Sequence, residues 1–129
     1  GKRIDSTKAW QMPQGGVDDK EYIESAAKRE LKEETGITSI KIIKKSEKEF
    51  IYNLPNELLG KIWNGKYKGQ KQTWFLAKFL GEHDEINIKQ KKAEFYDWRW
   101  AEPLELTKLI VPFKKKLYQE VIEEFKKYL

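Results

Sequence analysis

Apolar residues recur with the period of a helix at two places in the chain. The first spans Glu21 to Thr35, where one face carries an apolar stripe: Ile23, Ala27 and Leu31. This spacing predicts a helix, and we expect Asp18 or Asp19 to cap its N-terminus. Gly36 follows at the position where a glycine commonly ends a helix.

The second helical pattern runs from Pro112 to Leu129. Its apolar residues fall on one face: Phe113, Leu117, Val121, Ile122, Phe125 and Leu129. We therefore expect an amphipathic helix that starts at a proline and docks on the body of the domain. A shorter helix is predicted from Leu104 to Leu109, opened by Glu102-Pro103.

Patterns typical of strands lie between these helices. We expect short strand segments at Trp10–Pro13, Ile37–Ile43, Glu49–Tyr52, Thr73–Leu80 and Phe95–Ala101. The run Thr73–Leu80 (TWFLAKFL) is apolar on both faces, which predicts a central strand. The run Phe95–Ala101 (FYDWRWA) alternates aromatic and polar residues, as a half-buried strand does.

Glycine, proline and asparagine mark the connections between these segments. The predicted turns and loops are Gln14-Gly15-Gly16, Asn53–Asn56, Asn64-Gly65, Lys68-Gly69 and the polar stretch Gly81–Lys92. No internal repeat interrupts the pattern. Helices and strands interleave along the chain, which indicates the α/β class.

The chain holds 129 residues, of which 39% are apolar and 36% charged, so we expect one folded domain over residues 1–129. It has no cysteine, which excludes a disulfide framework, a thiolate metal site and a thiol nucleophile. No apolar stretch approaches the roughly 20 residues needed to span a bilayer, and no signal-peptide pattern opens the chain. We therefore expect a cytoplasmic protein with no membrane partner.

Lys and Arg outnumber Asp and Glu by 26 to 21, which gives a formal net charge of +5. A basic surface attracts polyanions such as nucleotides and RNA. A lysine-rich surface that only keeps the protein in solution explains the same charge. The charge therefore does not choose between these interpretations by itself.

Three carboxylates share one face of the first predicted helix. Glu30, Glu33 and Glu34 stand at i, i+3 and i+4, beside the apolar stripe, whereas Lys28, Lys32 and Thr35 are expected on the opposite side. Such like-charged neighbours repel one another. A hard divalent cation would offset the repulsion, because Mg²⁺ takes oxygen ligands. Arg29 is expected to orient one of the carboxylates.

The segment from Gly15 to Ile37 (GGVDDKEYIESAAKRELKEETGI) resembles the signature of the Nudix family. The matching positions are Gly15, Glu21, Arg29, Glu30, Leu31, Glu33, Glu34, Gly36 and Ile37. The resemblance implies an α/β/α sandwich with a mixed sheet and a catalytic loop-helix-loop. It also implies Glu30, Glu33 and Glu34 as metal ligands, helped by a carbonyl near Gly15 or Gly16. The residues implied as structural supports are Glu21, Arg29 and Gly36.

Motifs outside this segment resemble one subgroup, the bacterial RNA pyrophosphohydrolases and the similar dinucleoside polyphosphate hydrolases. They are WQMPQGG (10–16), YNLP (52–55), GQKQTWFL (69–76), EFYDWRW (94–100) and VPFKKKLY (111–118). Members usually begin with a further strand, so the resemblance predicts a sandwich that lacks its first strand in this chain.

The same resemblance implies further roles for five residues outside the signature. Glu94 is implied as an extra metal ligand or the general base, and Phe113 as a stacking partner for the nucleobase. Arg3 and Lys71 would contact phosphates, and Tyr52 would line the same channel. Simple packing is the alternative for Phe113 and Tyr52, and solvation for Lys71.

The implied reaction is the attack of water on phosphorus in a polyphosphate, assisted by Mg²⁺, with Mn²⁺ as an alternative. Glu94 or Glu34 would accept the proton, and Glu33 completes the catalytic set. The favoured substrate is 5′-triphosphorylated RNA, which would lose pyrophosphate, and a dinucleoside tetraphosphate is the alternative. A non-catalytic nucleotide- or RNA-binding domain is the alternative of another class. No DNA partner is expected, and the sequence does not identify protein partners.

Overall fold

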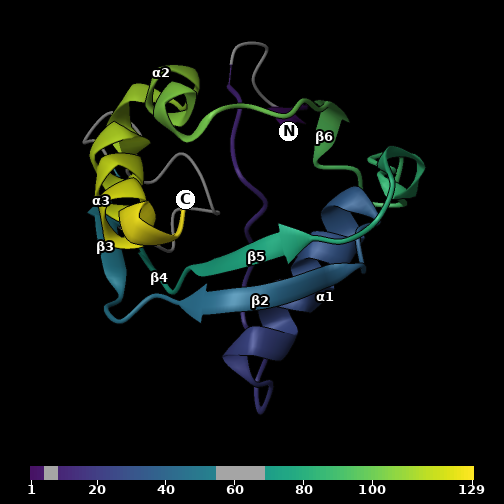
Figure 1. Cartoon of the computed structure of the whole chain (residues 1–129), viewed down its shortest axis with the longest axis horizontal. Coiled ribbons are helices and arrows are strands. Elements are labelled where there is room, and N and C mark those ends of the chain that lie inside the picture. The colour runs from purple at the N-terminus through teal and green to yellow at the C-terminus, as the bar shows by residue number, and fades with distance from the viewer. Residues whose placement is uncertain (5–8, 55–68) are drawn as a thin grey trace.

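The computed structural model describes residues 1–4, 9–54 and 69–129, and Figure 1 shows them as a coloured ribbon. Its helices are α1 (Ile23–Thr35), α2 (Leu106–Leu109) and α3 (Lys115–Phe125), with short 3-10 turns before α2 and on both sides of α3. The turns predicted at Asn64-Gly65 and at Lys68, and the end of the one predicted at Asn53–Asn56, lie outside the described residues. None of the described helices is long and apolar enough to cross a membrane.

The described strands form three separate antiparallel pairs. They are β1 (Lys2–Arg3) with β6 (Phe95–Asp97), β2 (Ile40–Lys45) with β5 (Phe75–Phe79), and β3 (Phe50–Asn53) with β4 (Gly69–Gln72). The α/β class predicted from the sequence is confirmed. The resemblance implied one mixed sheet, but the described residues form three two-stranded antiparallel ladders.

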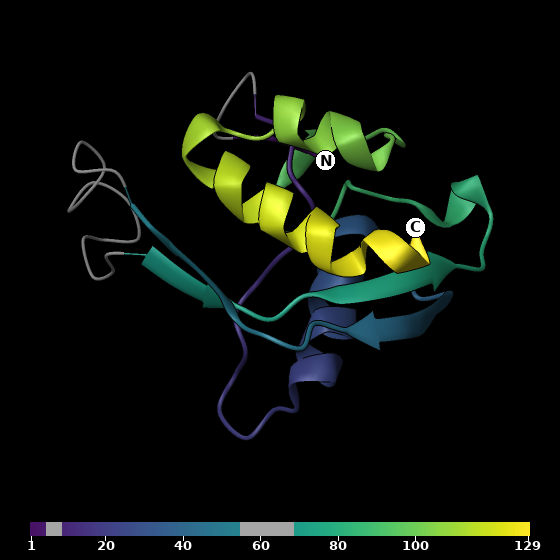
Figure 2. The ribbon, with the colours of Figure 1, turned by 60° about the vertical axis from the view of Figure 1, so that its left-hand side comes forward.

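Helices and strands lie in layers. In Figure 2, α3 and the β2–β5 pair occupy separate layers, and in Figure 1 α2 and α3 gather on one side of the molecule. The core lies where α3 meets β3. Its buried members are Phe50, Tyr52, Ile110, Leu117, Tyr118, Val121 and Phe125.

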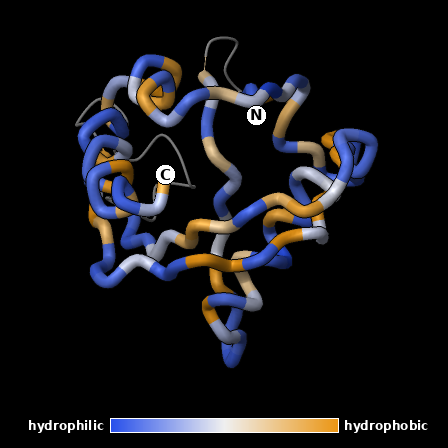
Figure 3. The backbone as a smooth tube through the Cα atoms, in the orientation of Figure 1, coloured by the Kyte–Doolittle hydropathy of each residue, from blue (hydrophilic) through white to orange (hydrophobic). Residues whose placement is uncertain are grey.

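The amphipathic helix predicted near the C-terminus is confirmed by its burial. Leu117, Val121 and Phe125 are buried at spacings of four residues, which places them on one face of α3. Figure 3 shows apolar and polar residues interleaved along the helices and strands. The buried face of α3 therefore closes the core over β3.

The first predicted helix is confirmed as α1, but its start differs from the prediction. Tyr22 is the N-cap residue and makes no side-chain cap hydrogen bond, so the prediction of Asp18 or Asp19 is wrong. The Asp18 N–H instead donates to the Glu21 carboxylate (3.0 Å). Gly36 ends the helix as predicted, with a left-handed φ of 76°.

The faces of α1 also depart from the pattern in two places. Thr35 is buried, with 8% of its surface exposed, and its hydroxyl donates to the Leu31 carbonyl (2.6 Å). Thr35, expected on the side opposite the glutamates, is thus buried, whereas Lys28 and Lys32, expected on the same side, are exposed. Ile23, expected in the apolar stripe, is 41% exposed because it lies at the open first turn of the helix.

Three strand predictions are corrected by the structure. Trp10–Pro13 forms no strand, only an isolated bridge between Trp10 and Lys2. The strand predicted over Phe95–Ala101 is limited to β6. The strand predicted as central, β5, pairs only with β2 among the described strands, and most of its residues are half-buried. One of its faces borders an open groove, so its apolar run does not reflect burial on both sides.

Candidate active site

Arg29 lies at the centre of the carboxylate cluster on α1. Its Nε donates to Glu21 Oε2 (2.8 Å), and its Nη1 donates to Glu30 Oε1 (2.8 Å). Nη1 also reaches Glu33 Oε2 (3.2 Å), while Nη2 donates to the carbonyl of Gly16 (2.9 Å). The planar guanidinium can serve several acceptors at once because its five N–H groups point outward in a fixed fork. One side chain thus joins the loop before α1 to two predicted metal ligands.

The charge of Arg29 stabilises the ionised form of Glu21. Hydrogen bonds from the Arg29 side chain and from the Asp18 backbone lower the pKa of Glu21 to about 2. The hydrogen bonds of Arg29 to Glu21, Glu30 and Glu33 in turn raise the pKa of Arg29. Both groups are therefore charged throughout the physiological pH range, which fits the supporting role that the resemblance implies for them.

Glu30 and Gly15 lie in direct contact. A Cβ atom at position 15 would overlap the Glu30 carboxylate, so only glycine fits there without a shift of that side chain. Burial raises the pKa of Glu30, and the hydrogen bond from Arg29 opposes this change. The glycine loop is thus positioned so that its backbone lies against a predicted metal ligand.

Glu34 is the most buried of the three glutamates, with only 5% of its surface exposed. One of its oxygens accepts a hydrogen bond from the Gln14 N–H (3.1 Å). Burial, together with the nearby charges of Glu30 and Glu94, raises its pKa to about 8, against the lowering effect of the hydrogen bond from Gln14. An added positive charge would strongly favour the ionised form of a carboxylate in such surroundings.

Glu94 lies near the same site, although it is far from α1 in the sequence. It directly precedes β6, and its carbonyl accepts a hydrogen bond from the Ile4 N–H (3.0 Å) next to β1. The side chain is exposed, and its charge acts on Glu34. The pairing of β1 with β6 therefore brings Glu94 close to α1.

The donor set suits a hard divalent cation, because it consists of carboxylate and carbonyl oxygens. The acidic groups are not gathered around one point: within residues 1–4, 9–54 and 69–129, no three Asp, Glu, His or Cys side chains form a metal cluster. Glu30 and Glu33 are engaged by Arg29 instead. The residues fit a metal, since the buried Glu34 lies among like charges, and binding would redirect Glu30 and Glu33 from Arg29 to the ion.

Three of the predicted substrate contacts lie together. The rings of Tyr52 and Phe113 are 6.0 Å apart between centroids and tilted by 45°. Tyr52 is buried, and burial raises its pKa to about 12, against the charge of Arg3. The Arg3 guanidinium donates to Gln11 Oε1 (3.0 Å). Phe113 is half-buried, so part of this residue is exposed at the surface.

Lys71 does not join this group. It is 60% exposed, and its Nζ lies 4.0 Å from the carboxylate of Glu49. Neighbouring residues of a strand point to opposite faces, and the neighbours on either side, Gln70 and Gln72, face Gln14 instead. The structure thus places Lys71 on a different face of β4 from the residues that contact Tyr52.

A network of glutamines connects the two halves of the site, and the sequence interpretation did not include it. The Tyr52 hydroxyl donates to Gln70 Oε1 (2.8 Å), which also accepts from Gln14 Nε2 (3.3 Å) and Gln72 Nε2 (3.0 Å). The indole N–H of Trp74 donates to Gln72 (2.8 Å). The alternation of glutamines in GQKQ was the available signal, because residues at i and i+2 share a strand face. Through Gln14, the network runs from Tyr52 to Glu34.

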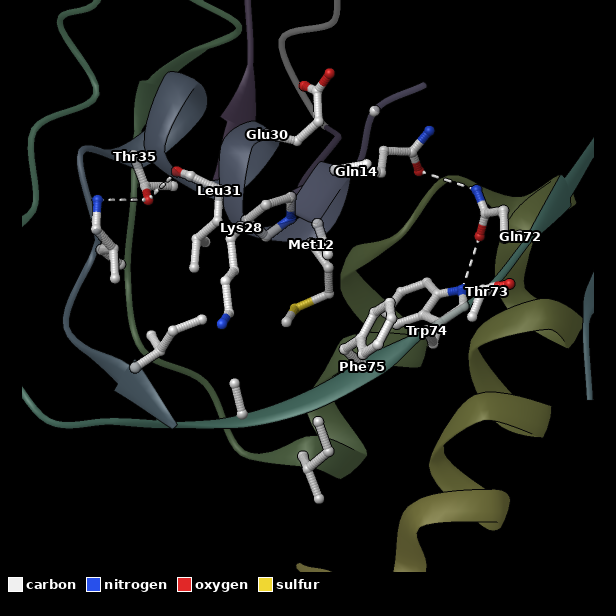
Figure 4. Close-up of a pocket in the computed structure, with 18 of the residues that line it drawn as sticks. Met12, Gln14, Lys28, Glu30, Leu31, Thr35, Gln72, Thr73, Trp74 and Phe75 are labelled. Carbon is white, nitrogen blue, oxygen red and sulfur yellow. Dashed lines mark hydrogen bonds between the residues drawn. The ribbon is translucent and has the colours of Figure 1, made fainter. Parts of the chain in front are cut away.

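A groove of about 1030 Å³ opens beside α1 and the β2–β5 pair. Figure 4 shows Met12, Leu31 and Phe75 around this space, with the hydrogen bonds of Gln14, Gln72 and Trp74 along one wall. Its lining includes Gly15 and Glu30 and is mostly apolar, with the basic side chains Lys28, Lys71 and Arg99 among its polar residues. The apolar walls offer few hydrogen bonds to phosphate oxygens, and the glycine loop and Glu30 at the edge of the groove connect it to the carboxylates of α1.

Comparisons with known proteins agree with this arrangement. A model of the NUDIX domain matches residues 2–121, which include α1, its glycine loop and the strands that carry the other site residues. The chain therefore belongs to the Nudix family and has the fold and hydrolase character of that family.

Similar proteins include several bacterial RNA pyrophosphohydrolases. The protein of that name from Sphingopyxis alaskensis is 54% identical over 97% of this chain and 81% of its own length. That of Novosphingobium aromaticivorans is 50% identical, over 98% of this chain and 81% of the relative. Among solved structures, dihydroneopterin triphosphate pyrophosphohydrolase from E. coli matches with a TM-score of 0.70 and 22% identity, over 95% of this chain and 83% of that chain. The last match supports the fold alone.

Proposed function

We propose that this protein is a pyrophosphohydrolase that acts on the 5′-triphosphate end of RNA with the help of Mg²⁺ or Mn²⁺. The observation that carries the proposal is the buried Glu34, which lies close to the charges of Glu30 and Glu94 and beside the glycine loop. A bound cation would stabilise its ionised form. The high identity to proteins named RNA pyrophosphohydrolase supports the choice of substrate.

Glu30, Glu33 and Glu34 would hold the metal, with the carbonyl of Gly15 beside them. A bound divalent ion supplies charge neutralisation for phosphate oxygens and lowers the pKa of bound water. Arg29 contacts Glu30 and Glu33 and also binds the carbonyl of Gly16, so it connects the proposed metal ligands to the glycine loop.

In the proposed reaction, water adds to the phosphorus next to the nucleoside, and the bond from that phosphorus to the bridging oxygen breaks. Pyrophosphate leaves, the RNA keeps a 5′-monophosphate, and Glu94 or Glu34 accepts the proton from the water. The nucleobase would stack on the open part of Phe113. Arg3 would face the phosphates, next to Tyr52.

Two other functions remain as alternatives. Asymmetric cleavage of a dinucleoside tetraphosphate needs the same base and phosphate contacts, so the pair Tyr52 and Phe113 would serve that substrate too. A non-catalytic binding domain is disfavoured because none of the signature glutamates is replaced.

The test is product analysis with Mg²⁺, in which 5′-triphosphorylated RNA and diadenosine tetraphosphate are offered in parallel. Glu33→Gln serves as the inactive control, and Glu24→Gln as the matched control, since Glu24 is an exposed glutamate of the same helix outside the cluster. We expect pyrophosphate release from RNA at the higher kcat/KM, lost in Glu33→Gln and retained in Glu24→Gln. Faster cleavage of the dinucleotide would favour the first alternative, and no turnover of either substrate would favour the binding domain.

A further inference from the structure

The lysine run 114–116 contains one buried residue. Lys114 has 2% of its surface exposed, whereas Lys115 and Lys116 are exposed. The cause is the 3-10 turn Pro112–Lys114 that leads into α3, in which the Lys114 N–H donates to the carbonyl of Val111 (3.0 Å). This turn directs the side chain of Lys114 inward while its two neighbours face the solvent.

The ammonium group of Lys114 lies against the aromatic rings of Tyr52 and Phe113. Its Nζ is 5.3 Å from the ring centroid of Tyr52 and 5.9 Å from that of Phe113. A cation within about 6 Å of a ring centroid is attracted by the negative face of the ring. The attraction is stronger at a buried site, because water does not compete for the charge. Lys114 therefore acts on the position of both rings.

Burial of a lysine is costly for a role that needs only packing. Removing an ammonium group from water disfavours its charged form, and a leucine or methionine would fill similar space without that penalty. The contacts with Tyr52 and Phe113 give the charge itself a role at this position. Tyr52 is also held from its other end, because its hydroxyl donates to Gln70.

We propose that Lys114 is a positioning residue of the substrate site, which fixes the tilt between Tyr52 and Phe113 so that the open part of the Phe113 ring can stack on the nucleobase of the substrate. The inference rests on the proposed function and deepens it. Lys114 acts through the two rings and does not contact the reacting phosphates. Its removal should therefore affect substrate binding more than the chemical step.

The experiment compares Lys114→Met with Lys115→Met and Lys116→Met, using the full chain and 5′-triphosphorylated RNA. Methionine keeps most of the side-chain length and removes the charge. For Lys114→Met we expect KM to rise about tenfold, as the loss of one desolvated cation–aromatic contact implies, with kcat changed less than about twofold. Lys114→Arg should restore most of the affinity because it keeps the cation.

A second readout follows the stacking itself. RNA that carries 2-aminopurine in place of its first base is titrated with protein in the absence of divalent metal. Stacking on Phe113 quenches the fluorescence, and we expect the quenching with Lys115→Met but not with Lys114→Met. Equal quenching and equal KM for these two variants, with active wild-type protein, would overturn the inference alone. Wild-type protein that neither hydrolyses nor quenches the RNA would overturn the proposed function as well.

A double-mutant cycle separates positioning from general destabilisation. In the Phe113→Leu background, Lys114→Met should cause a smaller rise in KM than in the wild-type background, because one of the two rings through which Lys114 acts is absent. An additional rise of the same size in that background would overturn the positioning role. Thermal unfolding checks that each variant is folded, and Lys114→Gln replaces the methionine variant if the latter unfolds.

Discussion

At the scale of single residues, the site depends on how one arginine distributes its hydrogen bonds. Arg29 contacts Glu21 on one side and Glu30 and Glu33 on the other. The ion pair with Glu21 persists to the lowest pH, because the pKa of Glu21 is lowered to about 2 and its carboxylate stays ionised above that value. The contacts with Glu30 and Glu33 are the ones that metal binding would change.

The lowered pKa of Glu21 predicts a definite pH dependence of stability. Its pKa in the folded protein lies below its ordinary value of 4.5, so the ionised form stabilises the fold above about pH 4.5. This contribution is lost as the pH falls through about 2. Glu21→Gln should therefore lower Tm at pH 7, and its difference from wild type should shrink below pH 4.5. Thermal unfolding from pH 7 to pH 2.5 measures this, with Glu123→Gln, an exposed residue of α3, as control. A constant difference across the range would contradict the assignment.

Several individual residues could not be assigned from the sequence, and the reasons are physical. Lys114 lies in a run of lysines that resembles a solvated surface, and only the 3-10 turn before α3 buries it. Gln14 and Gln70 have no charge to indicate a role, and their contact joins residues 56 positions apart. The family resemblance implied a phosphate contact for Lys71, and the alternation of β4 places its ammonium group beside Glu49.

At the scale of elements, the helices were more predictable than the strands. The helical period depends on local spacing, so α1 and α3 were predicted close to their observed bounds. The strand β5 was expected to be central because both faces are apolar, but burial depends on which elements cover each face. The N-cap of α1 was not predicted correctly, because Asp18 makes other contacts in the loop before the helix. Its N–H donates to Glu21, and its carboxylate pairs with Arg29.

The C-terminal end of α1 offers a test at this scale. Gly36 has a φ of 76°, and a Cβ there would lie 3.1 Å from the carbonyl oxygen of Glu85. Gly36→Ala should therefore lower the free energy of unfolding by about 1 kcal/mol or more, because a left-handed backbone conformation is unfavourable for alanine. Urea denaturation measures the change. Gly16→Ala is the matched control, since a Cβ there meets no atom within 4 Å, and equal effects of the two substitutions would refute this explanation.

At the scale of the whole molecule, the fold gathers distant segments around one helix. The glycine loop, the strand pair β3–β4 and the residue before β6 reach the surroundings of α1 through Gln14, Gln70 and Glu94. The turn before α3 is connected to them through the contact of Phe113 with Tyr52. The signature residues of α1 were predictable because they are contiguous in sequence. Their neighbours depend on tertiary contacts, so a family resemblance indicated Glu94 and Phe113, while the alternation of GQKQ placed Gln70 and Gln72 on one face but could not show their contact with Gln14.

The central claim is that the carboxylates of α1 bind a divalent cation, and Mn²⁺ binding tests it most directly. Free Mn²⁺ is followed by electron paramagnetic resonance during titration of wild-type protein, Glu34→Gln and the control Glu123→Gln. We expect wild type and control to bind Mn²⁺ equally, and Mg²⁺ to displace it. Glu34→Gln should bind at least about tenfold more weakly, because a charged ligand at the buried centre is lost. Unchanged affinity in Glu34→Gln, or no binding by wild-type protein, would contradict the account.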